Sequence, residues 1–355
     1  MKRIILTALA LLAGLAATAQ TSTKFIEATD LTLVGKYMDT PNPYHRVDTV
    51  KYKGFTASEK NQVISSAGLA VLFKTTSSTI SVYSEFGYQN KGANTMGLSL
   101  RGYDLYIRKD GEWLYAGTKE GKQQESVTIV KDMAPGVKEC MLYLPLYSEM
   151  LSVKVGVDEG AMLEPLESPF HNRIGVFGSS YTQGISTSRS GMSYPMQFMR
   201  MTGFQLLSLG CSGNCKLQPY FGAFLCDAPM DALIVDGFSN PSAELIEERL
   251  FPFIEQVQAA HPGMPMIFLQ TIRRGGRNFD TKIDEFEQDK QDTASRLMKE
   301  AMKKYKDVYF VQTNADDKAM STSVDGIHPD DHGYAIWAET IRKPVVKILH
   351  RYGIR

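Results

Sequence analysis

The chain has 355 residues, of which 43% are apolar and 22% are charged, proportions typical of a folded globular protein and not of a disordered one. Lysine plus arginine and aspartate plus glutamate both number 39, so the formal net charge is zero and no overall field attracts nucleic acid or an anionic membrane. The length exceeds that of one usual core, which predicts two domains. The arginine-rich run over residues 273–277 is interpreted as a solvated loop rather than a ligand clamp.

The first twenty residues have the pattern of a secretory signal. Lys2 and Arg3 precede an apolar run over residues 4–16, and Ala17 and Ala19 offer small residues for cleavage before Gln20. This run is too short to span a bilayer comfortably, and no later stretch is long and apolar enough to be transmembrane. We therefore expect a signal peptide at residues 1–19 and an exported protein, periplasmic or secreted, without an integral membrane segment.

Residues 24–164 consist of short β-rich runs separated by turns, with no long helical pattern between them. Asp110-Gly111 lies between two of these runs, a dipeptide that favours a hairpin. Regular spacing of short strands predicts a β-sandwich, which we assign to residues 20–167. The predicted strands cover residues 68–75, 79–86, 103–109, 112–117, 125–130, 140–147 and 151–157.

From residue 168 onward, strand-like runs alternate with segments of helical length. Strands are predicted at residues 173–177, 204–209, 231–236, 265–270 and 307–312. One helix is predicted over residues 241–261, with Pro241 at its first position, and another over residues 331–351. This alternation predicts an α/β domain over residues 168–355, with a parallel sheet covered by helices on both faces.

The four cysteines leave two interpretations open. Three of them, Cys211, Cys215 and Cys226, lie within sixteen positions, and Cys140 stands apart. Exported proteins can keep disulfides, for example between Cys215 and Cys226, but free buried thiols fit the sequence equally well. No C-x-x-C motif or interleaved histidine favours zinc.

Polar motifs follow the first three strands of the predicted parallel sheet, over residues 178–184, 208–214 and 236–241. Ligands bind outside the carboxyl ends of parallel strands, so these motifs predict a site. Gly-Ser pairs are mostly turns, but a serine becomes a nucleophile when a base, oriented by a third group, lies beside it. Only His328 and His332 lie in a stretch suited to that chemistry, where Asp325 precedes His328 by three residues.

Taken in order, these motifs resemble the blocks of the SGNH (GDSL-type) hydrolases. Residues 178–184 correspond to the first block, which makes Ser180 the nucleophile and places Ser179 where many relatives carry aspartate. The glycine of the second block is matched by Gly213, with Gly210 as the fallback, and the asparagine of the third block by Asn240. A second departure is Pro241, which follows Asn240 where many relatives carry aspartate. The last block, D-x-x-H, is matched by Asp325 and His328.

The N-terminal half carries Gly102 to Tyr106, similar to the G-x-D-L-Y signature of a β-rich domain that precedes a bacterial subset of these hydrolases. Residues 188–195 also resemble the segment that follows the nucleophile in that subset. The resemblance implies a three-layer α/β/α, flavodoxin-like SGNH-hydrolase domain with a parallel sheet, preceded by an N-terminal β-sandwich.

The implied function is that of an exported serine esterase acting on small acyl esters, and analogy with exported relatives indicates acetyl esters of carbohydrate. His328 is expected to take the proton of Ser180 while Asp325 orients the imidazole, and the Ser180 N–H, the Gly213 N–H and the Asn240 amide are expected to form the oxyanion hole. Neither a metal nor an organic cofactor is required. The alternatives are a lipid acylhydrolase of the lysophospholipase or thioesterase kind, which needs a long apolar channel, and a non-catalytic carbohydrate-binding protein on a hydrolase fold.

Two local patterns have competing interpretations. His328 and His332 have metal-pair spacing, but that interpretation leaves the serine loop unexplained, so His332 is expected to cap a helix or support the site from behind. Asp104 stands among four aromatic residues: Tyr103, Tyr106, Trp113 and Tyr115. We interpret this group as sandwich packing around a structural carboxylate, with an aromatic sugar platform as the alternative.

Overall fold

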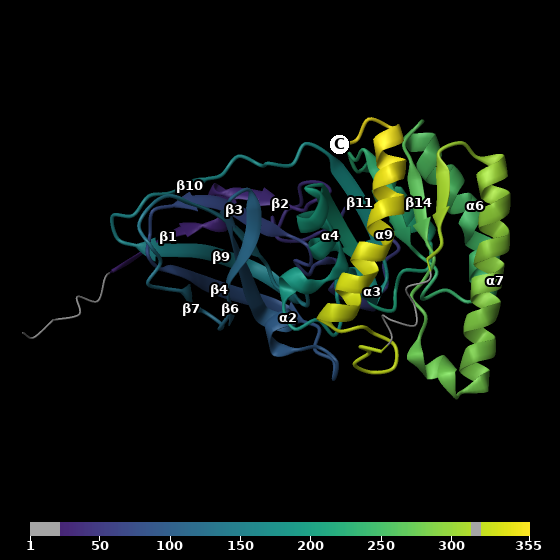
Figure 1. Ribbon diagram of the computed structural model, residues 1–355, viewed down its shortest axis with the longest axis horizontal. Helices are drawn as coiled ribbons and strands as arrows, with labels where there is room; N and C mark the ends of the chain where they lie inside the picture. Colours follow the sequence, from purple (N-terminus) through teal and green to yellow (C-terminus); the bar gives the residue numbers. More distant parts are fainter. Residues whose placement is uncertain (1–21, 314–320) are drawn as a thin grey trace, which may run out of the picture.

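The computed structural model describes residues 22–313 and 321–355, so the predicted signal peptide at residues 1–19 lies outside the described residues. The described chain forms a β-rich half and an α/β half that pack side by side (Figure 1). None of the described helices has the length and apolar character needed to cross a membrane.

The N-terminal half is a sandwich of two antiparallel sheets, as the strand spacing predicts. The first sheet has the order β1 (Thr23–Glu27), β9 (Ser148–Asp158), β4 (Ile80–Gln89) and β7 (Glu125–Val130). The second has the order β10 (Leu163–Pro165), β3 (Ala70–Thr75), β8 (Lys138–Tyr143), β5 (Gly102–Lys109) and β6 (Glu112–Glu120), with β2 (Thr32–Val34) also paired to β3. Three short helices interrupt the strands: η1 (Ala28–Asp30), α1 (Ala57–Val63) and α2 (Gly97–Arg101).

The predicted hairpin between β5 and β6 is present. Asp110 and Gly111 both have positive φ, 53° and 87°, as the two central residues of a type I′ turn require. Successive residues of the second sheet point to opposite faces: Val71 and Phe73 pack in the core of the sandwich, whereas Ala70 and Leu72 pack toward the α/β half. Strand β3 is therefore buried on both faces of the sheet.

The α/β half contains a five-stranded sheet in which every pairing is parallel. Its order is β12 (Gln205–Gly210), β11 (Arg173–Gly178), β13 (Ala232–Asp236), β14 (Met266–Leu269) and β15 (Val308–Val311), the 2-1-3-4-5 order of flavodoxin-like folds. Its helices are α3 (Ser180–Gln183), η2 (Ser190–Met192), α4 (Tyr194–Thr202), α5 (Pro219–Asp227), α6 (Ala243–Ala260), η3 (Gly275–Asn278), α7 (Thr281–Lys304) and α9 (Asp331–Arg351).

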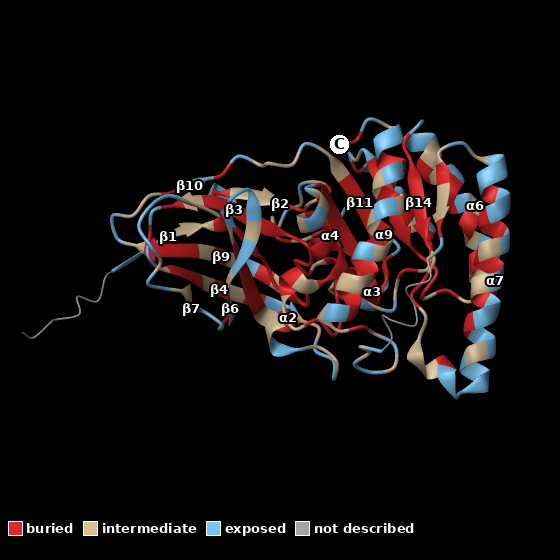
Figure 2. Ribbon diagram, viewed as in Figure 1, coloured by how far each residue is buried: buried red, intermediate tan, exposed pale blue. Residues whose placement is uncertain are grey.

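Helices cover both faces of this sheet. On β13, Ile234 packs in the cluster that includes residues of α4 and α9, whereas Leu233 and Val235 pack in the cluster formed with α5, α6 and α7. Figure 2 shows the strands buried and the outer surfaces of α6 and α7 exposed. The three-layer α/β/α architecture expected from the sequence is thus present.

One local expectation is corrected, and one of two open alternatives is selected. Helix α6 begins at Ala243 rather than at Pro241, because Ser242 is its N-cap and accepts a hydrogen bond from the Leu245 N–H at 3.4 Å. The four cysteines are free thiols, so the disulfide considered between Cys215 and Cys226 is not formed.

Candidate active site

Ser180 lies in the tight turn between β11 and α3. The strand ends at Gly178, and Ser179 caps the short helix by accepting a hydrogen bond from the Tyr181 N–H at 3.2 Å. Ser180 is the first residue of that helix and is 6% exposed. Its position at the carboxyl end of β11 is where an open parallel sheet places its ligands.

The structure brings Ser180, His328 and Asp325 into one hydrogen-bonded row. The Ser180 Oγ lies 2.8 Å from the His328 Nε2, and the His328 Nδ1 lies 2.8 Å from the Asp325 Oδ2. The Asp325 Oδ1 also accepts from the backbone N–H groups of Ile327 and His328, at 2.9 and 2.8 Å. The D-x-x-H spacing therefore closes a turn in which the carboxylate holds both the backbone and the ring of the histidine.

A residue of the β-sandwich completes this row. The Asn94 Nδ2, in the loop between β4 and α2, donates to the Asp325 Oδ2 at 2.6 Å. Burial acts to raise the pKa of Asp325, but the hydrogen bonds from His328 and Asn94 outweigh it and lower the pKa to about 2. Asp325 is therefore ionised throughout the neutral range. No local sequence pattern indicates Asn94, because it stands 231 positions before its partner.

His328 is held in a state suited to accept a proton. Burial lowers the pKa of His328, the Asp325 carboxylate opposes that effect, and the charge of Arg274 adds to the decrease, so the pKa lies below the ordinary 6.5. The imidazole is neutral at neutral pH as a result. With Asp325 against Nδ1, the lone pair of a neutral ring is at Nε2, facing the Ser180 hydroxyl.

Of the two glycines considered after β12, Gly213 is the one that lines the cavity beside Ser180. It is exposed, with φ at 74°. Gly210 is buried against α3, where a Cβ atom would lie 2.2 Å from the Gln183 backbone nitrogen, so its role is close packing. Gln183 also fixes the loop that carries Gly213, since its Oε1 accepts from the Ser212 N–H and hydroxyl, both at 2.9 Å.

Asn240 lies on the same wall of the cavity as Gly213. Its Oδ1 accepts a hydrogen bond from the Cys215 N–H at 3.3 Å, which leaves the amide N–H groups for another partner. The cavity also contacts Ser180 and His328, so these donors surround the space in which an acyl group would lie beside the hydroxyl.

Asp236, at the end of β13, explains one departure from the family pattern. Its buried Oδ2 accepts from the Thr182 hydroxyl at 2.8 Å and from the Ser179 hydroxyl at 3.1 Å. An aspartate at position 179 would place a second carboxylate against this one in a buried site. The serine instead supplies a hydrogen-bond donor.

The cavity at Ser180 has a volume of about 310 Å³ and is built by both halves of the chain. Its lining includes Asn90, Gly92, Asn94 and Thr95 of the sandwich, and Arg274 of the run over residues 273–277. The interpretation of that run as a solvated loop is wrong for Arg274 and for Arg277, which is 7% exposed. Both arginines are held inward by polar groups of α7.

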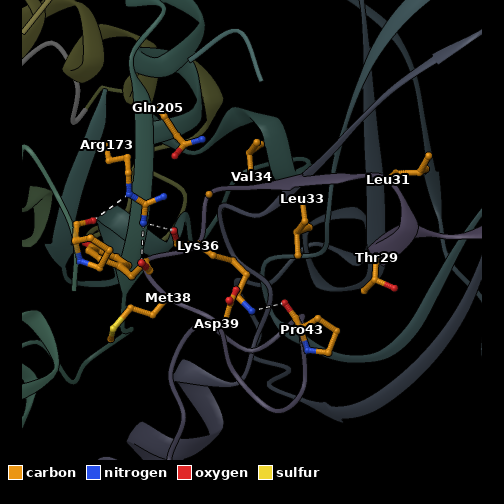
Figure 3. A pocket seen from close by; sticks show the side chains of 13 residues that line it. Thr29, Leu31, Leu33, Val34, Lys36, Met38, Asp39, Pro43, Arg173 and Gln205 are labelled. Carbon is orange, nitrogen blue, oxygen red and sulfur yellow. Dashed lines mark hydrogen bonds between the residues drawn. The ribbon is translucent and has the colours of Figure 1, made fainter. Parts of the chain in front are cut away.

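A larger cavity, of about 810 Å³, lies at the opposite edge of the parallel sheet. Arg173 and Gln205, the first residues of β11 and β12, line it. Figure 3 shows the Arg173 guanidinium bound to backbone carbonyl groups that include those of Lys36 and Tyr37, at 3.0 and 2.7 Å. The Arg173 guanidinium thus joins the two halves of the chain. The larger cavity lies at the amino ends of the parallel strands, whereas ligands bind at their carboxyl ends, so we assign the chemistry to the smaller cavity.

The residues of the G-x-D-L-Y signature dock the two halves. Tyr103 and Leu105 point into the sandwich core, whereas the buried Asp104 faces the α/β half. There its Oδ2 accepts from the Arg189 guanidinium at 2.5 Å and from the Gly191 N–H at 2.9 Å. The interpretation as a structural carboxylate holds: the Thr118 hydroxyl of the sandwich donates to its Oδ1 at 3.0 Å, and both contacts of its Oδ2 come from the α/β half.

The remaining local interpretations concern His332 and the aromatic residues near Asp104. Among the described residues no cluster of histidine, cysteine, aspartate and glutamate is arranged to hold a metal. His332 is exposed on α9, and the cap of that helix is Asp330, whose Oδ1 accepts from the Gly333 N–H at 2.9 Å. A sugar platform of the four aromatic residues near Asp104 is not formed, because Tyr103 and Tyr106 are buried.

Comparison with known families and structures agrees with this geometry. Residues 23–163 match the family described as the GxDLY N-terminus of SGNH-hydrolase-type esterases, and residues 171–347 match the GDSL-like lipase/acylhydrolase family. A comparison with curated proteins finds no match.

Three solved structures illustrate the similarity. A protein named as a GDSL-like lipase from Bacteroides ovatus is 34% identical, with a TM-score of 0.89, over 93% of this chain and 98% of its own. A salicylyl acyltransferase from a tetracycline biosynthetic pathway is 18% identical, with a TM-score of 0.71, over 92% and 97% of the two chains. An acetyl xylan esterase from Butyrivibrio proteoclasticus is 11% identical, with a TM-score of 0.54, over 94% and 99%.

The similarities to the acyltransferase and to the acetyl xylan esterase concern the fold alone. The similarity to the Bacteroides ovatus protein extends over nearly the whole of both chains, and so includes both segments that match family models. The chain therefore belongs to the GDSL-like (SGNH) hydrolase family, in the group whose catalytic domain follows a GxDLY domain.

Proposed function

We propose that this hydrolase is an exported serine esterase that removes small acyl groups, acetyl above all, from carbohydrate. The observation that carries the proposal is the row from the Ser180 Oγ through the His328 ring to the Asp325 carboxylate, with both hydrogen bonds at 2.8 Å. This is the arrangement in which a serine hydroxyl becomes nucleophilic.

In the first half of the reaction, the Ser180 Oγ attacks the ester carbonyl carbon while its proton passes to the His328 Nε2. Asp325, ionised because its pKa is about 2, stabilises the imidazolium that forms. The negative charge on the carbonyl oxygen is stabilised by the Ser180 and Gly213 N–H groups and the Asn240 amide. The C–O bond to the alcohol then breaks, His328 returns the proton to the leaving oxygen, and Ser180 carries the acyl group.

The second half repeats these steps with water. His328 takes a proton from a water molecule, whose oxygen attacks the acyl carbon. The same three donors stabilise the oxyanion. Collapse of this intermediate breaks the bond to the Ser180 Oγ, which recovers a proton from His328, and the carboxylic acid is released. Removing one oxyanion donor typically slows such a reaction about 100- to 1,000-fold.

The size and lining of the cavity favour a short acyl group. A volume of about 310 Å³ with amide, hydroxyl and guanidinium groups in its wall suits an acetyl ester on a polar alcohol better than a long lipid chain. The similar folds of an acetyl xylan esterase and an acyltransferase support acyl chemistry on this scaffold by analogy. Export is part of the proposal because residues 1–19 have the pattern of a secretory signal.

A fluorophosphonate label tests the activated serine. The protein without residues 1–19 is treated with the reagent, and the adduct is located by mass spectrometry. We expect modification of Ser180, its loss in Ser180→Ala, and its retention at Ser180 in the neighbouring variant Ser179→Ala. An unlabelled wild type that is folded would contradict the proposal and favour the non-catalytic carbohydrate-binding alternative.

Ester chain length separates the esterase from the lipid acylhydrolase. With 4-nitrophenyl esters, we expect kcat/KM to be highest for acetate and to fall for chains of eight carbons or more, because the amide, hydroxyl and guanidinium groups of the cavity wall do not suit a long apolar chain. The opposite order would favour the lipid acylhydrolase.

A further inference from the structure

Arg274 lies in the wall of the Ser180 cavity, in the loop that follows β14. Its Nη2 donates to the Ser239 carbonyl and hydroxyl oxygens at 2.7 and 3.1 Å, and its Nη1 lies 3.0 Å from the Glu287 Oε1. These contacts fix the guanidinium, yet its side chain remains 20% exposed toward the cavity. A fixed arginine costs little conformational entropy when it binds a ligand.

The charges around Arg274 do not balance. The same Glu287 oxygen also pairs with the Lys290 Nζ at 2.9 Å, so two cations share one carboxylate. The next cation along the run, Arg277, has its own partner in Asp284. Burial, and then the charge of Arg274, lower the pKa of Lys290, as expected where positive charge exceeds negative charge.

The cavity itself offers no carboxylate to offset this charge. Among its described lining residues, Arg274 and the titratable His328 are the basic side chains and none is acidic. The carboxylate of Asp325 is engaged by His328 and Asn94. A negatively charged substrate group in this space would therefore meet a guanidinium able to bind a carboxylate, with no acidic side chain in the cavity wall to repel it.

We infer that Arg274 binds an anionic group, a carboxylate, on the alcohol part of the ester, so that the preferred substrates are acyl esters of acidic sugars such as uronic acids. This inference rests on the proposed esterase function. The alcohol side is indicated because Arg274 and His328 line the same cavity, and the His328 ring must protonate the leaving alcohol oxygen. The sandwich residues Asn90, Asn94 and Thr95 line the same cavity and provide polar groups for a sugar.

The test compares two acetate esters that differ only in charge: 3-acetoxybenzoate and the neutral 3-acetoxybenzamide. The wild type should have the larger kcat/KM for the benzoate, and added salt should reduce that preference. In Arg274→Gln, the ratio of the two kcat/KM values should fall about tenfold, as loss of one charge-assisted contact predicts. The ratio is the readout because Arg274 also supports Ser239, next to Asn240, and its loss can slow both esters.

Arg273→Gln is the matched control. It removes the same charge one residue away, from a side chain that binds Asn278 at the surface and does not line the cavity. We expect Arg273→Gln to leave the ratio of the two kcat/KM values within about twofold of the wild type, because salt and water screen the charge of a surface arginine. Arg274→Lys, which keeps the charge but not the planar fork, should retain part of the preference.

Several results would overturn the inference. A wild type that prefers the benzamide, or a ratio that Arg274→Gln leaves unchanged, would assign Arg274 a purely structural role while the esterase function stands. If Arg274→Gln does not fold, the wild-type ratio and its salt dependence decide the question. Failure of the wild type to hydrolyse either ester or 4-nitrophenyl acetate would instead reject the proposed function.

Discussion

The substitution Asp236→Asn tests the electrostatics beneath the nucleophile turn. Asp236 is 2% exposed, and burial raises its pKa from the ordinary 3.8 to about 6 despite the hydrogen bonds from Thr182 and Ser179. A carboxyl group whose pKa is higher in the folded than in the unfolded state stabilises the fold fully below the unfolded pKa and loses that contribution as pH rises through the folded pKa. At about 1.4 kcal/mol for each pKa unit, the whole contribution is about 3 kcal/mol.

Asparagine cannot ionise, so the variant should not show this loss. Because the unfolded carboxyl group is already partly ionised at pH 4, the free energy of unfolding of the variant minus that of the wild type should increase by about 2 kcal/mol between pH 4 and pH 8. Urea unfolding at both pH values measures this difference. Asp110→Asn, in the exposed β5–β6 turn, is the control, and its difference should stay nearly constant. A difference for Asp236→Asn that does not change with pH would refute the reasoning.

Three further outcomes follow from the contacts of the site. Asn94→Ala removes a charge-assisted hydrogen bond to Asp325, so kcat/KM for 4-nitrophenyl acetate should fall about tenfold while thermal stability changes little. An undiminished kcat/KM would show that the contact is dispensable. Because the pKa of His328 is lowered, the acid limb of kcat/KM against pH should have its midpoint below 6.5, and a midpoint above 7 would contradict the assigned environment. Asp104→Ala leaves Arg189 without its carboxylate, so urea unfolding should show a loss of about 3 kcal/mol, whereas a loss below 1 kcal/mol would reject its docking role.

The fold could be predicted from the sequence because local patterns and tertiary structure agree in it. The alternation of Leu233, Ile234 and Val235 between two buried layers produces the continuous apolar run that indicates a parallel strand. The positive φ values of Asp110 and Gly111 are those their residue types favour. The start of α6 was misplaced because Pro241 and Ser242 both suit a helix start, and only the hydrogen bond from the Leu245 N–H distinguishes them.

The site was predictable where its residues belong to short motifs. Ser180 and the turn from Asp325 to His328 follow strands of one sheet, and their meeting follows from topology. Asn94 and Arg274 were not found, since each reaches the cavity through loop conformations and packing partners that leave no local pattern. An arginine in a run of arginines and glycines looks solvated in the sequence, and its inward position depends on the distant Glu287 and Ser239, which hold its guanidinium.

These missed residues show that the cavity belongs to both halves of the chain. The contact between Asn94 and Asp325 requires the sandwich to be placed against the α/β half within hydrogen-bonding tolerance. The ion pair of the buried Asp104 with the half-buried Arg189 contributes to that placement. So does the buried Arg46, whose Nη1 donates to the Gly210 carbonyl at 2.8 Å beside the loop of Gly213. An aspartate in the middle of a strand is costly for a sandwich alone, but it is explained if its partner lies across the interface that shapes the active site.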